Sequence, residues 1–305
     1  MLPRLAATAF RTLLAAITLG ASAAATAGMP VFCERGKEVG AAEQDRVLRF
    51  AGIVKRELEA SGGSVALIAR AGLDLSRFDL LYSHAGVALK DEGSAWTVRQ
   101  LYYACDESRP RIFDQGVAGF ALGADAPGKG HVSLVFPDGD RAARLEQAAR
   151  DKPLALALLA GRYSANAYAF GTRYQNCNQW VAELLASAWG GVQRRDKPRE
   201  QAQDWLRAQG YDAGPVKVKS RWLMFAGQFV PLVHVDDHPV EDLYALSLRV
   251  SVPASIEDFV HRRSPQARRV ELCHDTRRIV VHRGWEPIGA DCAPAPGDEV
   301  IPLDA

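Results

Sequence analysis

The segment NCNQWVAELLASAWGG at residues 176–191 is the most informative part of the sequence. After Cys177, apolar residues recur at helical spacing, which predicts a buried helix: Trp180, Val181, Leu184, Leu185, Ala188 and Trp189. Gly190 and Gly191 indicate its C-terminus. Asn176 is suited to cap the first turn, where unpaired N–H groups and the helix dipole favour a thiolate at Cys177. The segment predicts either a nucleophilic cysteine or a small buried residue that starts a core helix.

The N-terminus has the pattern of an export signal. Arg4 and Arg11 supply positive charge, residues 12–20 are apolar, and Ala25-Thr26-Ala27 is a suitable cleavage site. The apolar run is too short to span a membrane. We therefore expect a signal peptide at residues 1–27 and a periplasmic or secreted mature protein without a membrane span.

The charge balance excludes one class of partner. The whole chain has 37 basic and 36 acidic residues, and the expected leader contains two of the arginines. A nearly neutral mature chain has no overall electrostatic footprint for nucleic acid or acidic membranes. Its length suits one large domain or two small ones, and its oligomeric state is not predicted by the sequence.

Five cysteines are present, at positions 33, 105, 177, 273 and 292. In an oxidising compartment, an odd number leaves one thiol without an intramolecular partner. If that thiol is Cys177, the simplest pairing is Cys33–Cys105 and Cys273–Cys292, although two other connectivities remain open.

Hydrophobic patterning predicts an α+β fold. Residues 42–60 form an expected amphipathic helix, and residues 64–70, 80–89 and 95–103 are strand candidates that suggest an antiparallel meander. Further expected elements are a strand at 131–136, one or two helices at 138–159, a helix at 199–209, strands at 222–235, 243–252, 270–272 and 278–281, and a helix capped by Ser255. The best candidate for a boundary lies near residues 211–215, which divides a core at 28–210 from a β-rich extension at 211–305.

A thiol nucleophile needs a base within hydrogen-bond reach and a group that orients the base. Among seven histidines, His84 stands out because it opens a strand in Tyr82-Ser83-His84-Ala85-Gly86. Gly86 leaves room for a neighbouring element to approach the sheet. The alternative is a structural histidine at a sheet edge.

SHAGVAL at 83–89, followed far downstream by NCNQWV at 176–181, resembles the circularly permuted branch of the NlpC-type papain-like thiol hydrolases. In that branch the histidine lies on an early strand and the cysteine on a later helix. More closely, residues 66–89, NCNQW, HVDDHP at 234–239 and HRGW at 282–285 resemble an uncharacterised secreted bacterial family of unknown function within that superfamily.

This resemblance implies an antiparallel sheet packed on helices, with Cys177 facing His84. Cys177 would attack an acyl carbon, His84 would act as base and then acid, and the Cys177 N–H would help to stabilise the oxyanion. Gln100 is the expected orienting residue, with Thr97 and Arg99 as alternatives. Tyr82, Tyr174, Asn176 and Asn178 are candidates to line the site, although packing and capping are their commoner roles.

The expected activity is hydrolysis of an amide or acyl bond, with cell-wall peptides or acyl groups in the envelope as substrate and no cofactor. Two alternatives have other chemistry. The first is a non-catalytic binding or structural module on the same fold. The second is a metal ion held by His234, Asp236 and His238, because alternate residues of a strand share one face. The second alternative is disfavoured, since Pro239 indicates a turn and no fourth ligand is evident.

Overall fold

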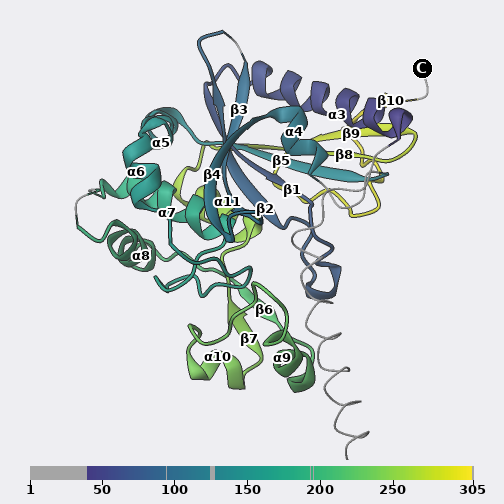
Figure 1. Ribbon diagram of the computed structural model, residues 1–305. Coiled ribbons are helices and arrows are strands. Elements are labelled where there is room, and N and C mark those ends of the chain that lie inside the picture. The colour runs from purple at the N-terminus through teal and green to yellow at the C-terminus, as the bar shows by residue number, and fades with distance from the viewer. Residues whose placement is uncertain (1–39, 94, 124–127, 193, 195, 304–305) are drawn as a thin grey trace, which may run out of the picture.

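An eight-stranded, fully antiparallel sheet forms the centre of the computed structural model, with the strand order β10-β9-β8-β5-β1-β2-β3-β4 (Figure 1). The structure describes residues 40–93, 95–123, 128–192, 194 and 196–303. The expected signal peptide at 1–27 and Cys33 lie outside this part of the chain. A mixed α+β class with a large antiparallel sheet is confirmed.

The strands of the main sheet come from both halves of the chain. They are β1 (Val65–Arg70), β2 (His84–Lys90), β3 (Trp96–Ala104), β4 (Arg109–Gly116), β5 (Gly130–Phe136), β8 (Arg268–His274), β9 (Arg278–Arg283) and β10 (Glu299–Pro302). The short strands β6 (Pro215–Lys217) and β7 (Ser247–Arg249) pair with each other in a separate two-stranded sheet.

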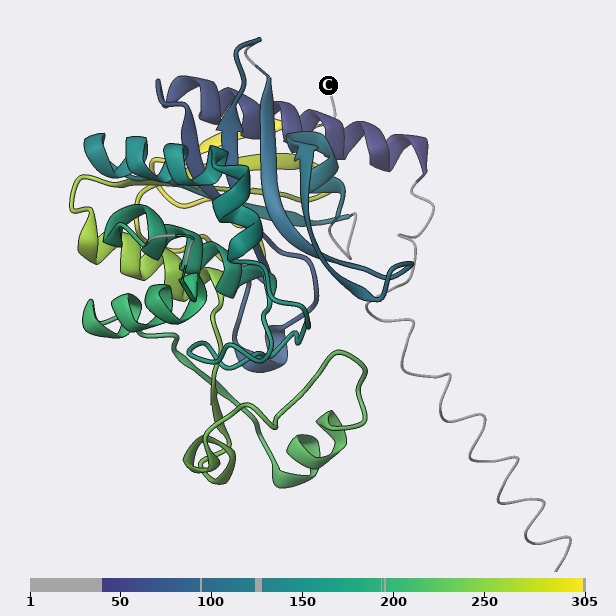
Figure 2. The ribbon, with the colours of Figure 1, turned by 60° about the vertical axis from the view of Figure 1, so that its left-hand side comes forward.

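Helices cover both faces of the main sheet (Figures 1 and 2). One face carries α3 (Ala41–Ala60) and α4 (Val117–Leu122). The other carries α5 (Gly139–Arg150), α6 (Lys152–Ala157), α7 (Cys177–Gly190), α8 (Pro198–Ala208) and α11 (Pro253–Arg263). The short helices α9 (Arg221–Gly227) and α10 (Val240–Tyr244) lie with β6 and β7 in a small lobe, and a 3-10 turn, η1, spans Ser76–Phe78.

Strand alternation divides the core into two layers. In β1, Leu67 and Ala69 face the α7 side, whereas Ala66 and Ile68 face α3. A strand buried on both faces is almost continuously apolar, which explains the sequence VALIAR. Trp180 is the largest of the fully buried side chains of the α7 layer.

Most of the expected elements are present close to their predicted positions. The three early strands form the antiparallel neighbours β1, β2 and β3, so the predicted meander is confirmed. The expected helix at 138–159 is divided into α5 and α6 at Asp151, whose side chain accepts from the Leu154 N–H at 3.1 Å. The helix that starts at Cys177 ends at Gly190, followed by Gly191 at φ 68°.

Three predictions beyond residue 211 are wrong. Residues 222–235 contain α9 and turns rather than a strand, because Ser220 accepts from the Leu223 N–H and caps a helix start. Within 243–252 only Ser247–Arg249 is a strand. Ser255 is not the cap of α11: the helix starts at Pro253, and Ser255 hydrogen-bonds to the backbone of Val252.

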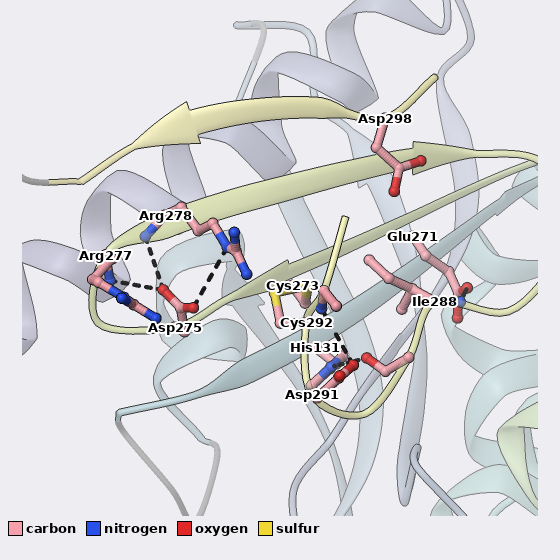
Figure 3. The surroundings of a disulfide bond; sticks show 12 residues. His131, Glu271, Cys273, Asp275, Arg277, Arg278, Ile288, Asp291, Cys292 and Asp298 are labelled. Carbon is pink, nitrogen blue, oxygen red and sulfur yellow. Dashed lines mark hydrogen bonds and ion pairs between the residues drawn. A yellow bond between two sulfur atoms is a disulfide. The ribbon is translucent and has the colours of Figure 1, made fainter. Parts of the chain in front are cut away.

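The C-terminal strands join the main sheet, and a disulfide secures the segment between them (Figure 3). Cys273 forms a disulfide with Cys292, which is one of the two bonds of the simplest pairing expected from the sequence. Nearby, the Ile288 N–H donates to Glu271 at 2.6 Å. Cys105 is also disulfide-bonded, while its expected partner Cys33 lies outside the described residues. Within the described chain, Cys177 is the free cysteine.

Among the helices that the structure describes, none combines the length and the apolar character needed to cross a bilayer.

Candidate active site

Cys177 begins α7 because Asn176 caps the helix. The Asn176 side chain accepts from the Gln179 N–H at 2.7 Å, and its amide nitrogen donates to the carbonyl oxygens of Ala165 and Ser251. These three hydrogen bonds hold the side chain of Asn176, the residue before Cys177, in one position. The predicted capping role of Asn176 is therefore present, and the side chain is used for structure rather than exposed to a ligand.

The first turn of α7 packs directly against the start of β2. The Asn178 amide donates to the Ser83 carbonyl at 3.2 Å, and the N–H of Ala85 is a hydrogen-bond donor to the Cys177 sulfur. These two contacts lie on either side of His84 in the chain. The structure therefore brings the helix start and the histidine-bearing strand together, although they are far apart in sequence.

His84 is held by Gln100. The distance between His84 Nε2 and Gln100 Oε1 is 2.5 Å, and both side chains are buried. An amide oxygen only accepts, so Nε2 carries the proton and Nδ1 of the neutral ring is the basic nitrogen. Of the three residues considered for the orienting role, Gln100 makes this contact, whereas Arg99 pairs with Asp114 and donates to the Ala149 carbonyl.

Gly86 makes the His84–Gln100 contact possible. A Cβ at Gly86 would lie 2.8 Å from a methyl group of Val98 and 3.3 Å from the Cβ of Gln100. The space is thus filled by side chains of the adjacent strand β3. The neighbouring element for which Gly86 leaves room is strand β3 of the same sheet.

The thiol and the imidazole are both neutral in this structure. Burial raises the pKa of Cys177 to about 11, despite the lowering effects of N–H groups at Ala85, Asn178 and Cys177 itself. Burial and the charge of Arg70 lower the pKa of His84 to about 3, against the opposite effect of Gln100. The expectation that the helix start yields a resting thiolate is therefore wrong, since desolvation of a buried charge outweighs the backbone donors.

No hydrogen bond joins the Cys177 sulfur to His84. The sulfur lies 3.6 Å from the Asn178 amide oxygen, and Cys177 is close enough to Tyr163 to contribute, after burial, to raising the pKa of that hydroxyl. The His84 ring packs against Tyr102 and Phe120, with centroids 6.0 and 5.9 Å away. Both groups adjoin the start of β2, but the His84 ring packs on Phe120 in the α3–α4 core layer, whereas Cys177 belongs to the α7 layer.

The other predicted site residues have structural partners. Tyr82 is buried and donates its hydroxyl to Glu271 at 2.7 Å. Tyr174 stacks on His234, with ring centroids 4.4 Å apart. Asn178 is the one of this group that contacts both the sulfur and the residue before β2, Ser83.

Sequence reasoning missed Arg70 and Tyr163. Arg70 lies opposite His84 in the β1–β2 register, and its guanidinium is 5.4 Å from the centre of Phe120. For Arg70, the sequence feature that could have indicated a role is its position as a cation at the end of the apolar run VALIAR. Tyr163 had no local signal, because it reaches Cys177 only through the fold of the loop before α7.

The segment His234–His238 is not arranged as a metal site. It lies in turns rather than a strand, and its side chains have separate partners: His234 stacks on Tyr174, Asp236 pairs with Arg173 at 2.8 Å, and His238 Nε2 contacts the Asn166 carbonyl at 2.7 Å. Among the residues that the structure describes, no group of three or more His, Cys, Asp or Glu side chains is arranged to hold a metal ion.

Together, the fold and the site define an α+β protein with a buried thiol at a helix start and a buried histidine, held by an amide, at the start of the strand that this helix contacts. Residues 57–260 match the family described as an uncharacterized protein conserved in bacteria (DUF2145). The match covers more than half of the chain, and the protein belongs to this family. No curated protein and no solved structure shows significant similarity to it.

The neutral resting thiol predicts a distinct pH dependence of alkylation. With a pKa of about 11, the thiolate is on the order of one part in ten thousand at pH 7. We expect iodoacetamide to modify Cys177 more slowly than glutathione at pH 7, with a rate that rises about tenfold per pH unit between pH 7 and 9. Mass spectrometry measures the rate, and Cys177→Ala gives the background. A rate that is constant above pH 6 would instead show a preformed ion pair.

Proposed function

We propose that the protein is a cysteine-dependent hydrolase or acyltransferase, with Cys177 as nucleophile, His84 as base and Gln100 as the positioning residue. The 2.5 Å contact between Gln100 Oε1 and His84 Nε2 carries this proposal, together with the contact of the first turn of α7 to Ser83, the residue before His84. Gln100 fixes the tautomer of the ring and so leaves Nδ1 available for the thiol proton. The placement in the permuted papain-like superfamily is part of the same proposal.

The neutral pair determines how such a reaction proceeds. The sulfur forms a bond to the carbonyl carbon of an amide or ester while the thiol proton passes to Nδ1 of His84. The imidazolium then gives that proton to the leaving amine or alcohol as its bond to carbon breaks. Water, or an acceptor hydroxyl or amine, releases the acyl group from Cys177. The Cys177 N–H is a candidate donor to the oxyanion.

Export from the cytoplasm is the second part of the proposal. The leader-like sequence at 1–27 and the Cys273–Cys292 bridge both suit an oxidising compartment. In the periplasm, amide bonds of cell-wall peptides are the nearest abundant substrates of the proposed chemistry. Acyl groups of envelope lipids are the other substrate class.

A non-catalytic binding module is the alternative, and one observation favours it. The Cys177 sulfur has no hydrogen bond to His84, and burial holds its pKa at about 11. In that case the cysteine is a small packing residue between α7 and β2. The two functions differ in whether His84 accelerates reactions at Cys177.

Acylation by a carbonyl electrophile distinguishes the hydrolase or acyltransferase from the non-catalytic binding module. A biotinylated p-nitrophenyl peptide ester is expected to acylate Cys177, and His84→Ala is expected to slow this step about a hundredfold, the usual contribution of a general base. Gln100→Ala should give an intermediate rate, because the ring loses its orientation. Intact-protein mass spectrometry gives the rates and peptide mapping the site.

His261→Ala is the matched control, since His261 is exposed and stacked on Trp285 far along the chain from the site. It should react like the wild type. Thermal unfolding confirms that each variant is folded. Equal rates in the wild type and His84→Ala would remove His84 as the base, and no acylation of the folded wild type would favour the binding module.

A further inference from the structure

The small lobe formed by β6, β7, α9 and α10 extends from the main body (Figures 1 and 2). Its own core is small: Val218, Leu248, Val250 and Val252 are buried there, and Leu223 and Met224 of α9 pack against them. A helix of seven residues normally turns one apolar side inward and a polar side to solvent. In α9 the outward side is apolar as well.

The outward side of α9 and the turn that follows it are aromatic. Trp222, Phe225 and Phe229 are 81, 52 and 72% exposed. Their rings form a row, with centroids 6.4 Å apart for Trp222 and Phe225 and 5.2 Å apart for Phe225 and Phe229. Contiguous exposed apolar groups of this size mark an interaction surface rather than ordinary surface variation. We call these three residues the aromatic row.

Among the residues that the structure describes, half of the exposed large hydrophobic ones fall in one short part of the chain. Six of the twelve lie between residues 222 and 244: Trp222, Phe225, Phe229, Val230, Val240 and Tyr244. The other six are dispersed over residues 48–156 and 300. The concentration on one projecting lobe indicates that the lobe meets an apolar partner.

Positive charge precedes the aromatic row. Lys217, Lys219 and Arg221 are exposed, and none of them forms an ion pair with a described residue. The sequence contains no acidic residue between Asp212 and Asp236. The near-neutral charge of the whole chain therefore conceals a segment with three cations and three exposed aromatic rings.

We propose that this surface attaches the protein to an anionic phospholipid bilayer, with the aromatic row inserted between headgroups and Lys217, Lys219 and Arg221 against the phosphates. Tryptophan and phenylalanine favour the boundary between headgroups and acyl chains, and basic residues beside them add attraction to anionic lipids. The cations select a bilayer over a second copy of this chain, because two copies would bring like charges together. The attachment is peripheral, since α9 is short.

The lobe is tied to the loop that leads into Cys177. The Ala165 N–H donates to the Leu232 carbonyl at 2.7 Å, the His234 N–H donates to Asn166 Oδ1 at 3.0 Å, and the His234 ring stacks on Tyr174. Attachment through α9 would therefore hold the candidate site close to the membrane surface. The proposal does not depend on the chemistry at Cys177.

Vesicle binding tests the attachment. The protein is mixed with vesicles of phosphatidylcholine alone, or with vesicles that also contain about 30% of the anionic lipid phosphatidylglycerol. Binding is measured by co-sedimentation. We expect binding to the anionic vesicles. Trp222→Ser combined with Phe225→Ser and Phe229→Ser, or Lys217→Gln combined with Lys219→Gln and Arg221→Gln, should each weaken it at least about tenfold.

The matched control is Leu48→Ser combined with Leu156→Ser, which removes residues that are 52 and 55% exposed elsewhere on the surface. It should bind like the wild type. No binding to anionic vesicles, or equal binding by the aromatic-row variant, would overturn the proposal. So would a concentration-dependent dimer that this variant abolishes while vesicles have no effect, because a second copy would then be the partner.

Discussion

Glu183→Ala is expected to lower the free energy of unfolding by about 3–5 kcal/mol, the usual cost of leaving one partner of a buried ion pair alone. Glu183 lies on α7 and is completely buried. It pairs with Arg199 of α8 at 2.8 Å and accepts from the amides of Gln175 and Gln203 at 2.6 and 2.7 Å. Its removal leaves a buried guanidinium without its counterion and takes one acceptor from each of two buried amides.

The effect should extend to the loop that precedes Cys177. Arg199 also donates to the carbonyl oxygens of Thr172, Gly171 and Tyr174. This guanidinium therefore holds the approach to the helix start while Glu183 holds the guanidinium. We expect amide hydrogen exchange in residues 171–176 of Glu183→Ala to increase more than exchange in β1 or β5.

Urea denaturation followed by circular dichroism measures the stability loss. Asp258→Ala is the matched control, because Asp258 forms an exposed ion pair with Arg262 one helical turn away, and its loss should cost less than about 1 kcal/mol. Glu183→Leu combined with Arg199→Met removes both charges and should recover much of the loss. A cost below that of the surface control would show that the pair does not support the α7–α8 packing.

The parts of the fold that could be predicted are those with strong local periodicity. The helix after Cys177 has apolar residues at helical spacing and a glycine end, and the meander has three short apolar runs with turn residues between them. Residues 222–235 were assigned wrongly because Trp, Phe and Val favour strands on a half-buried sheet. This segment does not pair with either sheet. The N-cap of α9, in which Ser220 accepts from the Leu223 N–H, therefore determines its structure.

The candidate site was predictable only in part, because its residues meet through sheet register and not through sequence spacing. His84 and Gln100 were accessible from their position on neighbouring strands. Arg70 and Tyr163 influence the same site from strands and loops that only the three-dimensional fold brings near. The protonation state was also out of reach, since the helix start favours a thiolate locally and burial reverses that preference.

The contribution of Glu257 to the stability of the protein is expected to fall as the pH rises from about 4.5 to 7, and it is measured as the difference between the wild type and Glu257→Gln. Glu257 is buried, and burial raises its pKa to about 7, despite Arg269 and the Ser133 hydroxyl. An acid whose pKa is higher in the folded state binds its proton more tightly there. The resulting stabilisation is complete below the unfolded pKa of about 4.5 and is lost as the pH passes 7.

The loss should reach about 3 kcal/mol by pH 8, because each unit of pKa difference corresponds to about 1.4 kcal/mol. Urea denaturation of the wild type and Glu257→Gln between pH 4.5 and 8 measures it, and other titrating groups cancel in the difference. Glu92→Gln, an exposed change in the turn after β2, should give a curve parallel to the wild type. If the curve of Glu257→Gln is also parallel to that of the wild type, then the pKa of Glu257 is the same in the folded and unfolded states, and the prediction is wrong.

Besides burial, the pKa of Glu257 is raised because this part of the core has too few positive charges for its carboxylates. Arg269 pairs with Glu257 at 3.1 Å and also with Glu271, so one guanidinium serves two buried carboxylates. Glu271 has two further donors, the Tyr82 hydroxyl and the Ile288 N–H. Glu257 has fewer, so its charged form is the less well compensated of the two. Proton uptake at Glu257 is the response that burial of an uncompensated charge requires, and Arg269→Met should therefore destabilise the protein more at pH 8 than at pH 5.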